Sequence, residues 1–108
     1  MNQPLEMMKA LSDRNRLRVV AALMTHDELC ACHLIELLQI TGATASRHMD
    51  VLLRSGLVQS RKAGRWVHYR LTDDFPAPLF QWLETEVLTD PGIKADRKAL
   101  IKITTLIH

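Results

Sequence analysis

The hydrophobic pattern of the chain changes once from helical to alternating, and that change limits the folds open to it. Residues 33–39 and 43–55 place apolar side chains at helical spacing on either side of a tight turn. Thr41 is a suitable N-cap for the second of these helices, and Gly56 is a suitable end. Residues 66–71 then alternate apolar and polar side chains, as a half-buried strand does. Two short helices followed by a hairpin predict a helix-turn-helix with a β-hairpin wing.

Further helices are expected around this pair, in a single domain that covers residues 1–108. Leu5 and Met8 indicate a short helix over about residues 3–10, and Ser12 is the expected N-cap of the next helix. The apolar stripe expected to bring that helix into the core is Leu17, Val20, Ala21 and Met24. The chain has 108 residues, 47% of them hydrophobic, which suits one small core. The expected fold class is mainly α with a β-hairpin wing, a winged helix-turn-helix.

The charges are segregated along the chain. Residues 41–72 hold six basic side chains against the single acid Asp50, although the net charge of the whole chain is only +2. Residues 73–90 hold five acids and neither Lys nor Arg. A cluster of this kind is usually a solvated face, but one-sided segregation in a small domain is also typical of phosphate contacts. The basic residues are Arg47, Arg54, Arg61, Lys62, Arg65 and Arg70.

Four polar side chains lie near the start of the helix expected over about residues 43–55. That end of a recognition helix enters the major groove of DNA. Arg47 can pair bidentately with a guanine edge, and Ser46 can reach a base edge. Thr44 and His48 are expected to contact phosphates. A polar helix face is more often simply solvated, so this pattern alone is weak and gains support from the adjacent hairpin.

The hairpin expected over about residues 57–71 has a basic loop. Arg61, Lys62 and Arg65 surround Gly64, which permits a turn. A basic hairpin directly after a recognition helix is the wing of a winged helix-turn-helix. Its cations are expected to contact backbone phosphates or the adjacent minor groove, and so to contribute affinity and salt sensitivity.

Cys30 and Cys32 are the only two thiols of the chain, and they lie just before the helix-turn-helix. In a reducing cytosol such a pair is better explained by metal binding or redox chemistry than by a structural disulfide. The alternative is that both are buried small hydrophobes, which is common for Cys. Thiolates are the soft ligands that thiophilic ions prefer.

The spacing of the pair also predicts a switch. On a regular helix, residues i and i+2 point roughly 200° apart, so their sulfurs cannot easily share one ion. In an extended segment, side chains two apart lie on the same side. Coordination at Cys30 and Cys32 is therefore expected to favour a non-helical backbone there. This would disturb the start of the helix at residues 33–39 and change the angle of the helix at residues 43–55.

Four segments together resemble the ArsR/SmtB family of winged-helix repressors, in its arsenite-responsive branch. They are Leu11–Arg18, Glu28–Leu34, Thr44–Met49 and Arg61–Leu71. The resemblance implies a homodimer that binds operator DNA and leaves it when As(III) or Sb(III) binds both thiolates.

This chain departs from the family pattern at two positions. His33 stands where relatives usually have Asp, which is expected to weaken the helix N-cap and to offer an imidazole as a further metal ligand. Ile35 stands where several relatives have Cys, which leaves two sulfurs in this segment.

Apolar side chains at both ends of the chain predict a dimer interface. The expected contacts are made by helices at about residues 3–10 and 74–89, with Asp73 and Asp74 as a cap of the second helix. A two-fold dimer would place two recognition helices one DNA turn apart, on a pseudo-palindromic operator. The alternative is an intrachain core helix. A further helix at residues 93–108 has no assigned role. The interface residues expected are Leu5, Met8, Leu79, Leu83 and Val87.

Other functions are less well supported by the sequence. The thiol pair could instead sense oxidants, reactive sulfur species, or another thiophilic metal such as Cd(II) or Pb(II). A thiol oxidoreductase is disfavoured because no βαβ pattern accompanies the pair, and no catalytic constellation or permanent cofactor site is evident. The five histidines lack the spacing of a zinc site. No apolar run has transmembrane length and no signal peptide is recognisable, so a cytoplasmic protein is expected.

Overall fold

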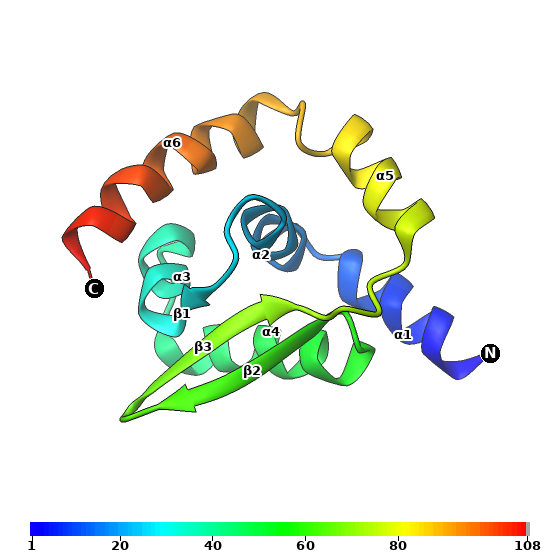
Figure 1. Cartoon of the computed structure of the whole chain (residues 1–108), viewed down its shortest axis with the longest axis horizontal. Coiled ribbons are helices and arrows are strands. Elements are labelled where there is room, and N and C mark those ends of the chain that lie inside the picture. The colour runs from blue at the N-terminus through cyan, green and yellow to red at the C-terminus, as the bar shows by residue number, and fades with distance from the viewer. Residues whose placement is uncertain (108) are drawn as a thin grey trace.

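The predicted helix-turn-helix and hairpin are both present, and they pack around a central helix (Figure 1). The structure is a computed structural model that describes residues 1–107. Its elements are α1 (Asn2–Leu11), α2 (Arg14–Thr25), β1 (Leu29–Cys30), α3 (Ala31–Leu38), α4 (Gly42–Ser55), β2 (Val58–Ala63), β3 (Trp66–Leu71), α5 (Ala77–Glu86) and α6 (Pro91–Leu106). The strands form one antiparallel sheet in the order β1-β3-β2. The predicted fold class, mainly α with a hairpin wing, is confirmed.

Helix α2 forms the centre of the core. Five successive residues, Val19 to Leu23, are buried, because α1, α4, α6 and β3 all pack against this helix. The sequence predicted burial of one stripe only, and its outer members Leu17 and Met24 are partly buried. A helix covered on several sides does not need a single apolar face. Fully buried Leu and Val side chains each contribute roughly 1.5–3 kcal/mol to folding.

The predicted ends of α4 are confirmed, but the predicted N-cap of α2 is wrong. Thr41 Oγ1 accepts from the backbone N–H of Thr44 at 3.1 Å, and Gly56 ends α4 with a φ of 83°, both as predicted. Ser12, however, does not cap α2. Asp13 does, with its carboxylate accepting from the N–H of Arg16 at 3.0 Å. Ser12 instead ends α1, where its hydroxyl donates to the carbonyl of Lys9.

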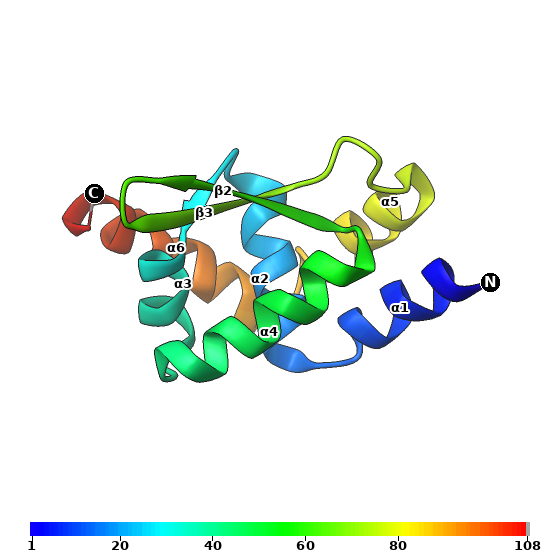
Figure 2. The same cartoon turned by 90° about the horizontal axis from the view of Figure 1, so that it is seen from below.

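The hairpin has the predicted inward face, and it lies along α4 (Figure 2). Tyr69 is buried, and Val67 and Leu71 pack against the core from the same side of β3. Gly64 has a φ of 64°, which suits a tight turn. The strands are longer than expected, because β2 continues to Ala63 and leaves only Gly64 and Arg65 between the paired residues.

The C-terminal third differs from its prediction. The helix expected at residues 74–89 is the shorter α5, which begins after Pro76. Proline disfavours helical geometry in the residue before it, so Asp73 and Asp74 remain outside the helix and do not cap it. Asp73 is instead paired with Arg70, with an N–O distance of 3.0 Å.

Two of the expected interface residues belong to the core of the same chain. Leu83 is 0% exposed and Val87 is 7% exposed, so their assignment to a dimer interface is wrong. Leu79 is partly buried against the same core. The segment without an assigned role forms α6, which packs on α2 and α3. Among residues 1–107, no helix is both long and apolar enough to cross a membrane.

Candidate DNA-binding surface and two-thiol site

The start of α4 presents an exposed polar face. Ala45, Met49 and Leu52 turn into the core, which leaves Ser46 and Arg47 exposed on the other side. Arg47 Nη2 donates to Thr44 Oγ1 at 3.3 Å, so the guanidinium is held near the N-terminal end of the helix with donors to spare. This geometry suits an Arg that approaches a base edge.

His48 does not lie on that exposed face, which corrects its expected phosphate contact. Only 16% of its side chain is exposed, and its Nδ1 lies 3.8 Å from an oxygen of Asp13. Arg16 is 3.2 Å from the same ring nitrogen and also donates to the carbonyl of Ala10 at 2.8 Å. One residue along a helix turns the side chain by about 100°, which takes His48 from the face of Arg47 to the side of α2. His48 and Arg16 therefore join α4 to the α1–α2 junction.

Two of the three basic residues predicted in the loop of the wing lie in a strand instead. Arg61 and Lys62 lie within β2 and not in the loop. Arg61 forms two hydrogen bonds of 2.6 and 2.8 Å with Glu28, and this guanidinium holds the pKa of Glu28 below its usual range. Arg65 lies in the turn, 5.9 Å from the ring centroid of Trp66. Lys62 and Arg65 are thus the exposed cations nearest the tip, and Arg61 is partly neutralised.

The two sulfurs converge without any unwinding of a helix. Cys30 precedes α3 with extended backbone angles (φ −71°, ψ 150°), and Cys32 lies in the first turn. Their Sγ atoms are 2.7 Å apart, with the Cys32 thiol donating to Cys30. The helix begins at Ala31 and not at residue 33, so the expected conflict between two helical cysteines does not arise. Cys30 is the N-cap, because its sulfur accepts from the N–H of Cys32 at 3.3 Å.

His33 completes a capping box and does not weaken it. Its Nδ1 accepts from the backbone N–H of Cys30 at 3.0 Å, and its Nε2 lies 2.6 Å from the carbonyl oxygen of Ile107. Because Nδ1 accepts, Nε2 must carry the proton and donate. Neither ring nitrogen has a lone pair to offer a metal in this arrangement, which corrects the expectation of His33 as a ligand. Within residues 1–107, no cluster of three or more Cys, His, Asp and Glu is arranged to hold a metal ion.

A short strand that the sequence did not predict joins the thiols to the wing. Strand β1 pairs with β3, with Leu29 opposite Tyr69 and Cys30 opposite His68. Glu28, the preceding residue, pairs with Arg61 of β2. Two residues are too few to show a periodicity, so no sequence signal marks this strand. The backbone of Cys30 is therefore paired directly with a strand of the hairpin.

Alkylation of Cys32 by iodoacetamide is expected to be slow at neutral pH. Burial and the hydrogen bond with Cys30 raise the pKa of Cys32 from 9.0 to about 11. Since the thiolate is the reacting form, the rate should rise about tenfold per pH unit up to about pH 11. The folded protein keeps this proton where an unfolded thiol has lost it, so the associated stability is present below pH 9.0 and is lost towards about pH 11. Site-resolved mass spectrometry of quenched samples measures the rate, and a plateau near pH 9 would contradict the shift.

Comparison with known proteins places the chain among regulators. The family described as "Bacterial regulatory protein, arsR family" matches residues 13–60. The arsenical resistance operon repressor of Escherichia coli K12 is 43% identical over 74 residues, which are 68% of this chain and 63% of the repressor. The arsenic resistance transcriptional regulator ArsR2 of Pseudomonas putida is 30% identical over 99 residues, 92% of this chain and 86% of that protein. The cadmium resistance regulatory protein CadC of Listeria innocua is 44% identical over 61 residues, 56% of this chain and 51% of CadC. The chain thus spans about two thirds to half of the length of the E. coli and Listeria relatives.

Solved structures of similar regulators have the same fold. The transcriptional repressor BigR from Xylella fastidiosa matches with a TM-score of 0.67 and 30% identity, over 82% of this chain and 90% of BigR. The homodimeric winged helix-turn-helix domain of Mb0332 from Mycobacterium bovis matches with a TM-score of 0.68 and 26% identity, over 77% of this chain and 76% of that domain.

Proposed function

Because the chain belongs to the ArsR family of bacterial regulatory proteins, we propose that it is a metalloid-responsive transcriptional repressor. It binds operator DNA as a homodimer and leaves the DNA when As(III) or Sb(III) binds Cys30 and Cys32. One observation carries this proposal: the two sulfurs lie 2.7 Å apart beside a strand that pairs with the wing. As a DNA-binding regulator it acts in the cytoplasm and has no enzymatic role.

DNA binding is assigned to α4 and the hairpin. The N-terminal half of α4 enters the major groove, where Ser46 and Arg47 contact base edges and Thr44 contacts phosphate. Lys62 and Arg65 contact phosphates from the wing. Arg61 contacts a phosphate only when its ion pair with Glu28 opens. This division places sequence choice on α4 and salt-dependent affinity on the wing.

The homodimer is assigned to α1 and α5. Leu5 is 49% exposed, Met8 is 70% exposed and Trp82 is 57% exposed, so both helices present large apolar side chains that a partner can cover. Leu79 remains in the proposed interface as a partly buried residue. Trp82 is proposed as an interface residue in place of Leu83 and Val87, because those two side chains are buried in the core of the same chain. The M. bovis domain, which is described as homodimeric, supports a homodimer.

A Met8→Glu variant is expected to shift the protein from dimer to monomer. An unpaired charge at the centre of an apolar interface costs about 2–4 kcal/mol, which raises the dissociation constant roughly 30- to 1,000-fold. Sedimentation equilibrium at several concentrations measures the change. Ile101→Glu is the matched control, because Ile101 is 64% exposed but lies on α6. A dimer of unchanged strength in the Met8 variant would remove α1 from the interface.

The effector assignment is supported by the donor set and by the relatives. Two thiolates suit As(III) and Sb(III), but also Cd(II) and Pb(II). Relatives named for arsenic resistance and for cadmium resistance both match this chain. Residues 1–107 bring together two sulfurs and no third protein ligand. We favour the metalloid because a three-coordinate ion can complete its coordination with an exogenous thiol or water.

A redox switch is the second candidate, and the same distance supports it. A disulfide requires about 2.05 Å between the sulfurs, so the observed 2.7 Å has to close by less than about 1 Å. Peroxide would take two electrons and two protons from the thiols, forming the disulfide and water. A mass loss of about two hydrogens under oxidant, together with loss of DNA binding, would favour this candidate.

The test is an operator-binding titration of the reduced protein. The operator is first selected from a random pool of DNA duplexes, and binding is then repeated with arsenite, cadmium, zinc and peroxide. The proposal requires the largest loss of binding with arsenite. Release by peroxide alone would favour the redox switch, and release by none of the four would reject regulation through the thiols.

A further inference from the structure

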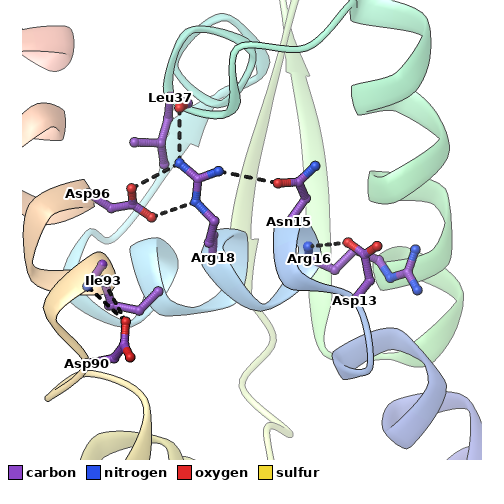
Figure 3. A network of polar contacts seen from close by, with 9 residues as sticks. Asp13, Asn15, Arg16, Arg18, Leu37, Asp90, Ile93 and Asp96 are labelled. Carbon is purple, nitrogen blue, oxygen red and sulfur yellow. Dashed lines mark hydrogen bonds and ion pairs between the residues drawn. The ribbon is translucent and has the colours of Figure 1, made fainter.

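Helix α6 is fastened at two points that lie near opposite ends of α3. Asp96 accepts from Arg18 at 2.8 and 3.0 Å, and Arg18 also donates to the carbonyl of Leu37 at 3.3 Å (Figure 3). At its other end, Ile107 accepts from His33 at 2.6 Å. Figure 1 shows α6 arching over α2, with its last turn beside α3. The helix therefore spans α3 from the Leu37 end to the cysteine end.

The imidazole of His33 connects α6 to the two-thiol site. One ring nitrogen accepts from the backbone N–H of Cys30 and the other donates to Ile107, so a single rigid ring joins both. Cys30 lies outside the helix, whereas Cys32 is within its first turn. Of the two cysteines, Cys30 is therefore the one whose backbone can move without unwinding α3.

Binding an ion requires the sulfurs to move apart. Two thiolates about 2.3 Å from one ion, with a tetrahedral angle between them, are about 3.8 Å from each other. The sulfurs are 2.7 Å apart in the structure. A separation about 1 Å larger is therefore needed. If the Cys30 sulfur turns towards the ion, it gives up its cap contact with the N–H of Cys32. Any backbone adjustment of Cys30 that accompanies this turn is opposed by the hydrogen bond from its own N–H to His33.

We propose that His33 is a positioning residue of the two-thiol site, and that it makes docking of the last turn of α6 and ion binding at Cys30 and Cys32 oppose each other. This inference rests on the proposed function only in taking the thiols as the effector site. When α6 is docked, its hydrogen bond at Ile107 fixes the imidazole of His33. The imidazole in turn fixes the backbone of Cys30, and this opposes the separation of the two sulfurs that an ion needs. By reciprocity, a bound ion loosens the last turn of α6.

The experiment uses His33→Asn in the full-length reduced protein. Asn places an oxygen where Nδ1 of His33 lies, so it can still accept from the N–H of Cys30, but it cannot reach Ile107. The probe is Cd²⁺, which binds thiolate pairs. Affinity is measured by competition with a chelating dye, and amide exchange is followed over residues 101–107 by mass spectrometry. Glu36→Gln is the control, because Glu36 is exposed on the same helix.

Two linked results are expected. The Asn variant should bind Cd²⁺ at least about fivefold more tightly than wild type, the lower end of usual couplings between sites. Cd²⁺ should accelerate exchange in the last turn of wild-type α6, and the ligand-free Asn variant should already exchange at the faster rate. Glu36→Gln should match wild type in both measurements. A purely structural role for the cap would lower stability without making exchange in α6 depend on Cd²⁺.

A second variant keeps the test decisive if His33→Asn folds poorly. Asp96→Ala removes both acceptors that Arg18 uses on α6, leaves His33 in place, and should also tighten Cd²⁺ binding. Equal Cd²⁺ affinities in all variants, with exchange in α6 unaffected by Cd²⁺, would overturn the inference. Arsenite is added in a separate arm with the operator. Failure of arsenite to release DNA counts against the proposed function, whereas the Cd²⁺ linkage stands or falls independently.

Discussion

Replacing Cys32 with Ser is expected to leave operator affinity within about threefold of wild type and to abolish its loss on addition of arsenite. Couplings between two sites are typically about 5- to 150-fold, so release in wild type should lie in that range. Ser is slightly smaller than Cys and keeps an O–H donor for the contact with Cys30, but its oxygen is a poor ligand for a thiophilic ion. Fluorescence anisotropy of labelled operator, with and without arsenite, measures both quantities.

The companion variant Cys30→Ser separates the two roles of that residue. Ser is among the best N-cap residues, so the start of α3 should be preserved or slightly stabilised while the sulfur ligand is lost. Circular dichroism and thermal unfolding check that both variants fold. Arsenite-induced release that survives in both variants would exclude the two thiols as the effector site, whatever their contribution to folding.

Replacing Arg47 with Ala is expected to weaken operator binding about tenfold to 100-fold and to relax the preference for a guanine. A bidentate Arg–guanine pair contributes about 1–3 kcal/mol of discrimination. Arg47 is exposed, and Thr44 holds its guanidinium at the end of α4 that is proposed to enter the groove. Competition with operators altered one base pair at a time measures affinity and preference together.

Arg54 provides the matched control for Arg47. It is an exposed Arg in the last turn of the same helix, about two turns after Arg47. Arg54→Ala should weaken binding no more than about threefold, without any change in base preference, and reduce the salt slope by at most about one. An equal loss in both variants would mean that α4 contributes only its overall charge, and the recognition role of its N-terminal half would have to be abandoned.

Local sequence patterns were sufficient for the elements that depend on near neighbours. The N-cap at Thr41, the left-handed end at Gly56 and the inward face of β3 each depend on residues a few positions apart, and all were predicted. Caps were misassigned where two neighbouring residues could serve. Asp13 and not Ser12 caps α2. Helix α5 begins only after Pro76, which leaves Asp73 and Asp74 outside it.

The candidate site could be predicted in composition but not in arrangement. The cysteine pair and the polar residues of α4 were identified from the sequence. The burial of His48 and Leu83 was not, because the face a helix buries depends on which neighbour it meets. The convergence of the sulfurs was also missed, because it requires Cys30 to lie in a strand that exists only through its pairing with β3.

The sequence by itself determined the helix-turn-helix, the hairpin and the presence of two sulfur ligands, since periodicity, caps and ligand type are local properties. Only the tertiary structure decided that Cys30 pairs with the wing, that Arg61 is held by Glu28, and that His33 joins the thiols to α6. These contacts join residues far apart in the chain. Their existence depends on how the packed elements are oriented, which no short segment encodes.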